Sequence, residues 1–441
     1  MLIGVSQSLQ NRARSQLIVP TDDLPEPMIA LTTARSRFPE NPALFRRCAL
    51  FLSLLLSGGL LIFPRLPILG LMVFACLLTT RFRLPPWSRF SYIYALLIII
   101  LIASIIRPGR IHFESIAIRV ANFAGALILL DVYLMSPAGA LTRDLFIFLK
   151  WMAAQAIATV FLAQFMGFLF LPVTFSDSPL QTILLLFNYH ELVEDLGGLI
   201  RPDGFFFEPG IFQIYLNLYL YLSVFIYKRA AHGALATLSV LSTQSTTGLI
   251  ICMMILGAAV VSYLRLGNLK RGLLPIALVV LIAPPITYLA YGNITDKLFG
   301  ESKGSSIARE YDFFTGVNIV AENPLLGIGF DHGRYLAESS RIGFADTALR
   351  EDNTEDRATS NGLLYLTYSL GIPLALLFVY GMFRQTLLPN RWVIGVWLLL
   401  SLFDEAIILR PFILLIILSA LVPNRRPNLI PPDGGLLKFR H

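Results

Sequence analysis

The chain has few charged residues. Only 14% of its 441 residues are Asp, Glu, Lys or Arg, whereas a typical soluble domain has about 25%. Apolar residues make up 56% of the chain, and the mean hydropathy is +0.69. A soluble protein of this length cannot bury so much apolar surface, so the composition excludes a soluble enzyme and a disordered chain. It predicts a polytopic membrane protein built mostly from spanning helices.

Cysteine is also scarce. Cys48, Cys76 and Cys252 all fall inside apolar runs, and no two of them have the spacing of metal ligands. This pattern excludes a disulfide scaffold and argues against a structural disulfide or a zinc site. We therefore expect no cofactor and assign no metal ligands.

Basic residues lie beside the apolar segments. A net charge of +7 would suggest a nucleic-acid partner in a soluble protein, but here it follows the excess of Lys and Arg that membrane proteins show in their cytoplasmic connections. We therefore predict no nucleic-acid partner, and both termini in the cytoplasm. The predicted spans are 48–64, 66–81, 91–106, 114–136, 145–171, 211–228, 233–246, 247–264, 273–291, 360–383, 391–403 and 405–422.

This topology divides the chain into regions. Residues 1–47 form a polar cytoplasmic tail, since no short apolar core with a small-residue cleavage site precedes them. Residues 48–422 form the membrane body, and residues 423–441 form a second cytoplasmic tail. Two long loops, 172–210 and 292–359, fall on the opposite side of the membrane. The second has 19 charged residues of both signs among its 68 residues, which favours a folded cap.

The predicted fold class is an all-α polytopic membrane protein of about 12 transmembrane helices. A large helical extracytoplasmic loop separates the ninth and tenth spans. Within the first long loop, residues 178–196 open with Ser-Pro and mix apolar with acidic residues. They predict an amphipathic helix that lies on the membrane surface.

The stretch R-P-D-G-F-F-F-E-P-G at 201–210 ends the first long loop and leads into a span. Its glycines and prolines allow the backbone to fold back against a ligand. The Arg201 guanidinium offers a planar fork of donors suited to a phosphate. A carboxylate such as Asp203 or Glu208 can take a proton from a sugar hydroxyl. The alternative is a loop end with ordinary interfacial charges, and local chemistry alone leaves both interpretations open.

Further candidates lie in and just after the second loop. The G-I-G at 327–329 resembles a phosphate loop only superficially, because no strand-then-helix context supports a dinucleotide site. Asp312 is a candidate base. His332 is a candidate base or ligand, although a lone loop histidine is more often neither. Asn361 is either the N-cap of a helix or a contact to a ligand above the membrane.

Charged residues inside the spans need partners. Arg119 and Asp131 lie 12 residues apart in one predicted span, or about 18 Å along a helix, so they cannot pair with each other. A central charge costs about 2.5–3.5 kcal/mol on insertion scales, so each should face a partner or a wet cavity. Arg119, near the outer end, can reach a lipid phosphate. Asp404, Glu405 and Arg410 at the outer turn of the last hairpin form a local ion pair or line the same cavity.

Five motifs occur in a definite order around the second loop. They are R-P-D-G-F-F-F-E-P-G at 201–210, S-T-Q-S-T-T-G at 242–248, S-S-I-A-R at 305–309, N-P-L-L-G-I-G-F at 323–330 and S-N-G-L-L-Y-L-T-Y-S-L-G at 360–371. In this arrangement the chain resembles the O-antigen ligase and Wzy-type polymerase superfamily of bacterial inner-membrane glycosyltransferases. The resemblance covers roughly residues 200–383.

The resemblance implies glycosyl transfer from undecaprenyl pyrophosphate on the periplasmic face of the inner membrane. A polymerase moves the growing glycan onto the next lipid-linked repeat unit, whereas a ligase moves it onto lipid A-core. In this family periplasmic arginines are thought to bind the pyrophosphate, which matches Arg201 and Arg309.

Pyrophosphate leaves without a general acid, so the acceptor hydroxyl needs only a base or good positioning. The expected catalytic residues are Glu208, Asp312 and His332, and the expected substrate-binding residues are Arg201, Arg309, Arg119, Asn361 and Arg334. The expected partners are the lipid-linked glycans, membrane lipid, a chain-length regulator and other polysaccharide assembly proteins.

One departure separates the two subfamilies. Ligases have a histidine, their usual candidate base, where this chain has Ser360-Asn361, and Glu-Pro-Gly after the arginine is more typical of polymerases. The hypothesis is therefore a polymerase of O-antigen, capsule or exopolysaccharide, with a ligase as the first alternative. The single long loop and the lack of two similar halves argue against a lipid-linked oligosaccharide flippase. Arginines and Glu208 in the outer loops argue against a non-catalytic scaffold.

Overall fold

The computed structural model describes residues 42–58, 64–105, 113–175, 178–191, 200–206, 208–265, 303–330, 332–341 and 361–423, with parts of 273–291. The tails predicted at 1–47 and 423–441 lie almost wholly outside the described residues. The loop at 342–360 and some residues of the predicted span at 273–291 lie outside them too.

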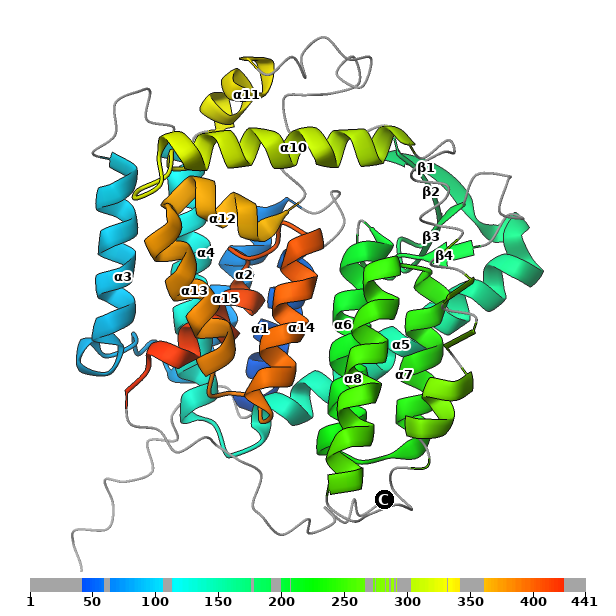
Figure 1. The fold of residues 1–441 in the computed structure, drawn as a ribbon. Coiled ribbons are helices and arrows are strands. Elements are labelled where there is room, and N and C mark those ends of the chain that lie inside the picture. Colours follow the sequence, from blue (N-terminus) through cyan, green and yellow to red (C-terminus); the bar gives the residue numbers. More distant parts are fainter. Residues whose placement is uncertain are drawn as a thin grey trace, which may run out of the picture. The chain divides into compact units, whose positions relative to one another are not determined.

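The membrane body is mostly helical (Figure 1). Its helices are α1 (Pro42–Leu56), α2 (Arg65–Thr80), α3 (Trp87–Ile105), α4 (Phe113–Met135), α5 (Ala140–Met166), α6 (Pro209–Tyr221), α7 (Ala230–Thr243), α8 (Thr246–Arg265), α10 (Lys303–Glu322), α11 (His332–Arg341), α12 (Gly362–Leu370), α13 (Ile372–Arg384), α14 (Arg391–Asp404) and α15 (Pro411–Leu418). Proline stands in the first turn of α6, α13 and α15, where its missing N–H is not needed and its fixed φ suits a helix.

Five helical segments among the described residues are long and apolar enough to cross a membrane. They are Trp87–Ile105, Phe113–Met135, Ala140–Leu169, Pro209–Ile226 and Thr246–Arg265. The helices α2, α13 and α15 are apolar but shorter. The chain is therefore a polytopic membrane protein, as predicted.

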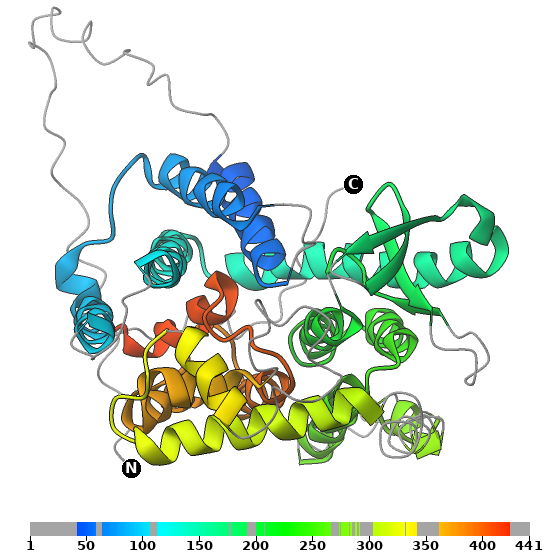
Figure 2. The same cartoon turned by 90° about the horizontal axis from the view of Figure 1, so that it is seen from above.

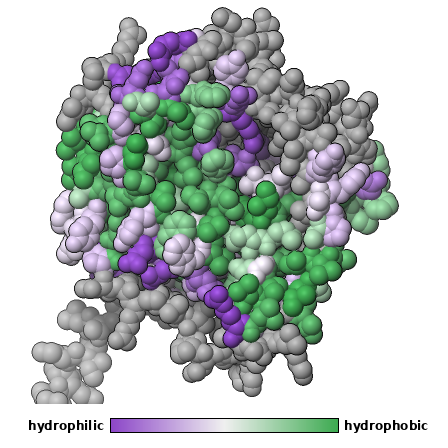
Figure 3. All heavy atoms as spheres, viewed as in Figure 1, coloured by the Kyte–Doolittle hydropathy of each residue, from purple (hydrophilic) through white to green (hydrophobic). Residues whose placement is uncertain are grey.

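Large apolar side chains also cover much of the surface. Trp151, Phe161 and Leu238 are 69%, 60% and 57% exposed. Hydrophobic residues spread across the middle of the face in Figure 3. Surface of this kind is what lipid tails solvate, so it fits a body that lies in a bilayer.

The loop between α5 and α6 contains a sheet, so the described chain is mostly helical, as predicted, but not all-α. Four strands, β1 (Leu171–Phe175), β2 (Ser178–Ile183), β3 (Phe187–Glu191) and β4 (Ile200–Pro202), pair in that order. All neighbours are antiparallel. This sheet replaces the amphipathic helix predicted at 178–196. Leu184 and Leu185 have positive φ angles and turn the chain, and the buried Thr182 and Asn188 side chains bond to each other across β2 and β3. A short apolar run in a sequence does not distinguish a helix from a strand. Here the hydrogen bond between Thr182 and Asn188 joins two paired strands.

The span predicted at 360–383 is two helices, α12 and α13, which meet at Gly371. Gly371 has φ 82° and ψ 164°, a backbone conformation almost confined to glycine. The motif at 323–330 packs against this break. Ile328 N donates to Tyr368 O at 2.7 Å, and Ile372 N donates to Pro324 O at 2.8 Å. The G-I-G segment therefore fits closely against a helix break, and the prediction of one continuous span was wrong.

The helix α10 lies across the end of the helices at which α12 begins (Figure 1, Figure 2). A Cβ on Gly316 of α10 would overlap the Leu364 side chain of α12. The second long loop thus contributes helices that pack on the membrane body, in agreement with a helical cap.

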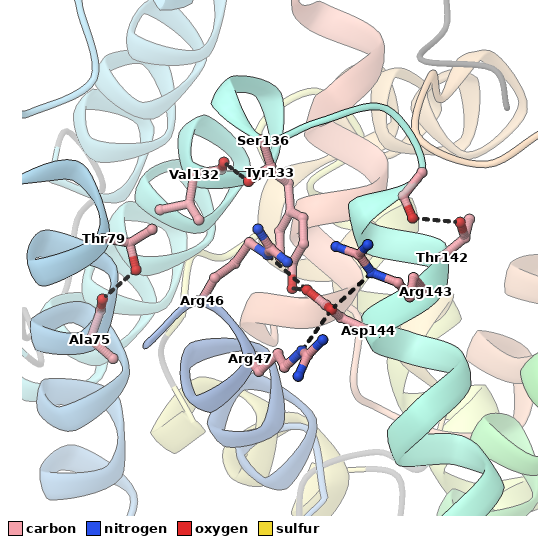
Figure 4. A network of polar contacts seen from close by, with 11 residues as sticks. Arg46, Arg47, Ala75, Thr79, Val132, Tyr133, Ser136, Thr142, Arg143 and Asp144 are labelled. Carbon is pink, nitrogen blue, oxygen red and sulfur yellow. Dashed lines mark hydrogen bonds and ion pairs between the residues drawn. The ribbon is translucent and has the colours of Figure 1, made fainter. Parts of the chain in front are cut away.

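A buried polar network joins α1, α4 and α5 (Figure 4). The wholly buried Asp144 carboxylate pairs with Arg46 Nε at 2.7 Å and with Arg47 Nε at 3.0 Å. The Tyr133 hydroxyl donates to the same carboxylate at 3.4 Å. Removing one partner of such a buried pair costs about 3–5 kcal/mol, so this network ties the three helices together.

Candidate active site

Arg201 lies at the junction of the sheet and the α7–α8 turn. On β4 it stands opposite His190 of β3. Its Nε donates to the carbonyl oxygen of Thr243 at 3.1 Å, and Gln244 Nε2 donates to the carbonyl oxygen of Ile200 at 3.4 Å. These bonds hold the R-P-D-G stretch against the Ser/Thr-rich turn. The bond to Thr243 uses Nε, and no hydrogen bond from the two terminal amino groups of Arg201 to another described residue is found.

His190 and Asp203 form a pair beside Arg201. The Nδ1 of His190 lies 2.6 Å from an Asp203 carboxylate oxygen, and the Asp203 side chain is completely buried. Burial raises the pKa of Asp203 to about 6, although the contact with His190 works in the other direction. Burial opposes the protonation of His190, but the hydrogen bond and charge of Asp203 outweigh it and raise the His190 pKa. The sequence places a histidine and an aspartate in this loop but does not reveal that they pair.

Glu208 is the residue directly before α6. Its backbone carbonyl accepts from Ile211 N and Phe212 N at 3.2 Å, and its side chain caps no backbone N–H. The carboxyl group is accessible to solvent. The protein around it nevertheless removes enough water to raise its pKa, while Arg309 lowers that pKa and Asp404 raises it again. Glu208 is thus an accessible carboxylate held between basic and acidic groups.

Arg309 of α10 reaches the end of α14. Its Nη1 lies 2.7 Å from a carboxylate oxygen of Asp404. The sequence left Asp404 either in a local ion pair with its neighbours in the hairpin or lining a cavity, and the structure pairs it with Arg309. Glu405, the next residue, is buried, and burial together with Glu208 and Asp404 raises its pKa well above the ordinary value. Arg309 and Glu208, predicted from separate motifs, therefore lie close enough to share electrostatic neighbours.

Two glycines allow this packing. Gly204 has φ 62° and lies flat against the Phe212 ring, while Asn188 Nδ2 donates to its carbonyl at 2.7 Å. A Cβ on Gly210 would overlap the Glu405 carboxylate. A side chain at Gly210 would therefore push Glu405 away from the start of α6.

Three predicted residues lie in α10 and α11. Asp312 is 5% exposed, and one of its carboxylate oxygens accepts from the Tyr335 hydroxyl at 2.7 Å. This bond ties α11 to α10. His332 is the first residue of α11, and its side chain lies outside the described atoms. Arg334 lies in the same helix and is half-buried.

Asn361 is the N-cap of α12. Its side-chain oxygen accepts from Leu363 N at 3.0 Å and from Leu364 N at 2.9 Å. This oxygen therefore caps the helix, which is one of the two roles that the sequence predicted for Asn361. Burying a helix start of this kind requires such a cap.

The two charges of α4 have separate surroundings. Asp131 pairs with Arg89 Nη1 at 3.2 Å. The Arg119 guanidinium lies over the Tyr365 ring, 5.5 Å from its centroid. The Nε of Arg119 is buried and has no hydrogen-bond partner among the described residues. The Arg119 side chain thus lies at the start of α12, and it forms no ion pair with another described residue.

Metal ligation has no support in the described part of the chain, where no group of three or more His, Cys, Asp or Glu residues could hold an ion. The chemistry available at the site is that of an accessible carboxylate, Glu208, beside the guanidinium groups of Arg201 and Arg309. Sequence reasoning found these three. It did not find His190, whose only signal was a histidine in a loop, and it placed Glu405 in the outer turn of the last hairpin without linking it to Glu208.

Comparison with known families supports the resemblance. Residues 232–379 match the family model of O-antigen ligase, Wzy_C. A search of curated proteins found no match. The matched residues include the 242–248 turn, α10 and the 323–330 and 360–371 motifs, while the 201–210 stretch lies before them. The family is one of polysaccharide-processing membrane proteins of the ligase and polymerase type, and it implies glycosyl transfer with lipid-linked glycan substrates. Residues 232–379 of this multi-pass membrane protein are thus similar to the O-antigen ligase (Wzy_C) domain.

Proposed function

We propose that the protein is a polymerase that joins lipid-linked repeat units into O-antigen, capsule or exopolysaccharide. The observation that carries this proposal is the position of Glu208. An accessible carboxylate with a raised pKa stands at the start of α6, near Arg201 and Arg309. A base of raised pKa is better suited to proton transfer near neutral pH than an ordinary carboxylate.

In the proposed step, a hydroxyl of the acceptor glycan attacks the anomeric carbon of the donor sugar. The bond between that carbon and the pyrophosphate oxygen breaks, and the electron pair leaves with the polyprenyl pyrophosphate. Glu208 accepts the proton of the attacking hydroxyl. Arg201 and Arg309 stabilise the negative charge that grows on the pyrophosphate, and their planar donor groups suit its oxygens.

The other predicted residues have supporting roles in this proposal. Asp312 and His332 are second candidates for the base, and the bond from Tyr335 favours a structural role for Asp312. Asn361, Arg334 and Arg119 are further candidates for contacts to the substrates.

The choice of polymerase over ligase rests on the base. Ligases carry a histidine where this chain has Ser360-Asn361, and here the oxygen of Asn361 caps α12. Glu208 supplies a base from another helix start. A lipid-linked oligosaccharide flippase is the alternative from a different class.

The proposal also includes the topology. The body at 48–422 has twelve spans in the bacterial inner membrane, with both tails in the cytoplasm and the two long loops in the periplasm. Its partners are lipid-linked oligosaccharides, membrane lipid, a chain-length regulator and other polysaccharide assembly proteins.

The test is the size distribution of lipid-linked and surface glycans in a strain that lacks this gene. Single repeat units on the carrier and no long polymer are expected. Long polymer left on the carrier would instead identify a ligase. Repeat units confined to the cytoplasmic leaflet would identify a flippase, and the catalytic role of Glu208 would then fall.

A further inference from the structure

One face of the helix α10 is apolar and exposed. Phe313 and Phe314 are 49% and 51% exposed, and Val317 is exposed as well. This spacing puts all three on one side of the helix, and the two phenylalanine rings pack edge to face with their centroids 6.0 Å apart. Leu325 and Leu326, which follow the helix, are also exposed. We refer to Phe313, Phe314, Val317, Leu325 and Leu326 as the apolar ridge.

The opposite face of α10 is used for packing. Asp312 accepts from the Tyr335 hydroxyl of α11 at 2.7 Å. Gly316 lies against the Leu364 side chain of α12, and Ile319 is buried. The helix cannot rotate to hide the apolar ridge without breaking these contacts. The exposure of the ridge is therefore a property of the fold.

Both ends of α10 are joined to the ends of apolar helices. Near its start, Arg309 Nη1 lies 2.7 Å from a carboxylate oxygen of Asp404, the last residue of α14. Just after its end, the carbonyl oxygen of Pro324 accepts from Ile372 N, at the start of α13, at 2.8 Å. Figure 2 shows α10 along one edge of the molecule. The helix therefore runs across the ends of α13 and α14 at the margin of the membrane body.

These two helices expose apolar side chains where α10 meets them. On α13, Ile372, Leu376 and Tyr380 are exposed and stand four residues apart, so they form one stripe. On α14, Phe403 is exposed and directly precedes Asp404, which pairs with α10. Such stripes on membrane helices face lipid tails. The apolar ridge therefore continues the lipid-facing surface of the body.

Lipid is the partner that fits this surface best. A contiguous apolar patch on a protein surface marks an interaction site. A helix that lies in the plane of the membrane buries its apolar face at the boundary between headgroups and acyl chains. The helix α10 has the required direction, because it crosses the ends of the other helices rather than running beside them (Figure 1).

We propose that α10 is an interfacial helix whose apolar ridge inserts into the outer leaflet of the membrane. The proposed topology is needed only to name the leaflet, and the inference does not depend on the polymerase. Insertion holds the cap on the membrane and sets Arg309, near the start of the same helix, at the depth of lipid phosphates.

The test measures what surrounds the apolar ridge in a bilayer. A nitroxide is attached through Phe314→Cys or Val317→Cys in the full-length protein, which is reconstituted in vesicles of phosphatidylethanolamine and phosphatidylglycerol. Cys48 is exposed and is replaced by serine, whereas the buried Cys76 and Cys252 are kept. Paramagnetic resonance then compares collisions of the nitroxide with oxygen, which concentrates among acyl chains, and with a neutral nickel chelate, which stays in water.

Two reference positions calibrate the measurement. Leu376→Cys, in the exposed stripe of α13, reports on lipid, and Arg341→Cys, at the exposed end of α11, reports on water. The ratio of oxygen to nickel collisions at positions 314 and 317 is expected to approach that at position 376. It should be several-fold higher than the ratio at position 341. The Cys48→Ser parent should take up no label.

Two results would overturn the proposal. A ratio at positions 314 and 317 equal to that at position 341 would show that the ridge lies in water. Few collisions with both reagents would show that protein covers it, such as a second copy of the chain. Each variant must elute as the wild type does, and Leu325→Cys is a third labelling position if one misfolds. A ridge in water in a protein that still makes long polymer would overturn insertion and keep the polymerase.

Discussion

At the scale of single residues, the ionisation of Glu208 determines whether it can act as the base. The protein around it removes water and so raises its pKa, while Arg309 lowers that pKa and Asp404 raises it again. The pKa of the neighbouring Glu405 is raised as well. Transfer activity is therefore expected to fall with decreasing pH at a value above the ordinary glutamate pKa of about 4.3.

Asp404→Asn tests that argument. It removes a negative charge near Glu208 and releases Arg309 from its ion pair, and both changes lower the Glu208 pKa. The acid limb of the pH–activity profile should move to lower pH. An acid limb that stays in place or moves to higher pH would show that Glu208 is not the group that titrates.

Arg201 offers a second test at this scale. Arg201→Lys keeps the positive charge but loses the planar fork, so the rate of transfer should fall at least about tenfold. Arg384→Lys is the matched control, because that side chain is exposed in the last turn of α13. Normal polymer from a stably expressed Arg201→Ala protein would remove Arg201 from the pyrophosphate site.

At the scale of elements, the sheet carries a pH-sensitive pair. The pKa of Asp203 is about 6 rather than the ordinary 3.8, so the folded state binds this proton more tightly than the unfolded chain. The stabilisation is complete below pH 3.8 and is lost as the pH rises through about 6. His190, whose pKa is also raised, adds a loss at higher pH in the same direction.

The melting temperature in detergent should therefore fall as the pH is raised from about 5 to about 8. The His190→Gln, Asp203→Asn double variant should show a flatter dependence over that range. A wild-type protein whose melting temperature rises with pH would contradict the surroundings assigned to the pair.

The break between α12 and α13 depends on one glycine. Gly371→Ala places a side chain at φ 82°, against the Leu325 backbone, so stability should fall by about 1–3 kcal/mol or more. Gly257→Ala in α8 is the control, because no atom lies within 4 Å of its added Cβ. Thermal unfolding of both variants in one detergent makes the comparison. Equal melting temperatures would show that the break tolerates a side chain.

At the scale of the whole molecule, the composition predicted a membrane protein, because so much apolar surface can be solvated only by lipid. The motif order indicated the resemblance, and the O-antigen ligase family model matches residues 232–379. The sheet could not be predicted, since Thr182 and Asn188 meet only once the strands are paired. The break at Gly371 was missed because the apolar run continues through it without interruption.

The candidate site was also only partly predictable from the sequence. Arg201, Glu208 and Arg309 were found because they lie in motifs. The ion pair of Arg309 in α10 with Asp404 in α14 depends on how distant helices pack. No spacing in the sequence carries that information.

The most direct test of the proposed function is reconstitution of the purified protein in vesicles with single lipid-linked repeat units as the only glycan. One substrate then serves as donor and acceptor. The account predicts a ladder of longer lipid-linked glycans with the wild type, and only single units with Glu208→Gln. The account would be contradicted if the wild-type protein transferred the glycan to a different lipid acceptor, and so was active, but left the lipid-linked repeat units as single units.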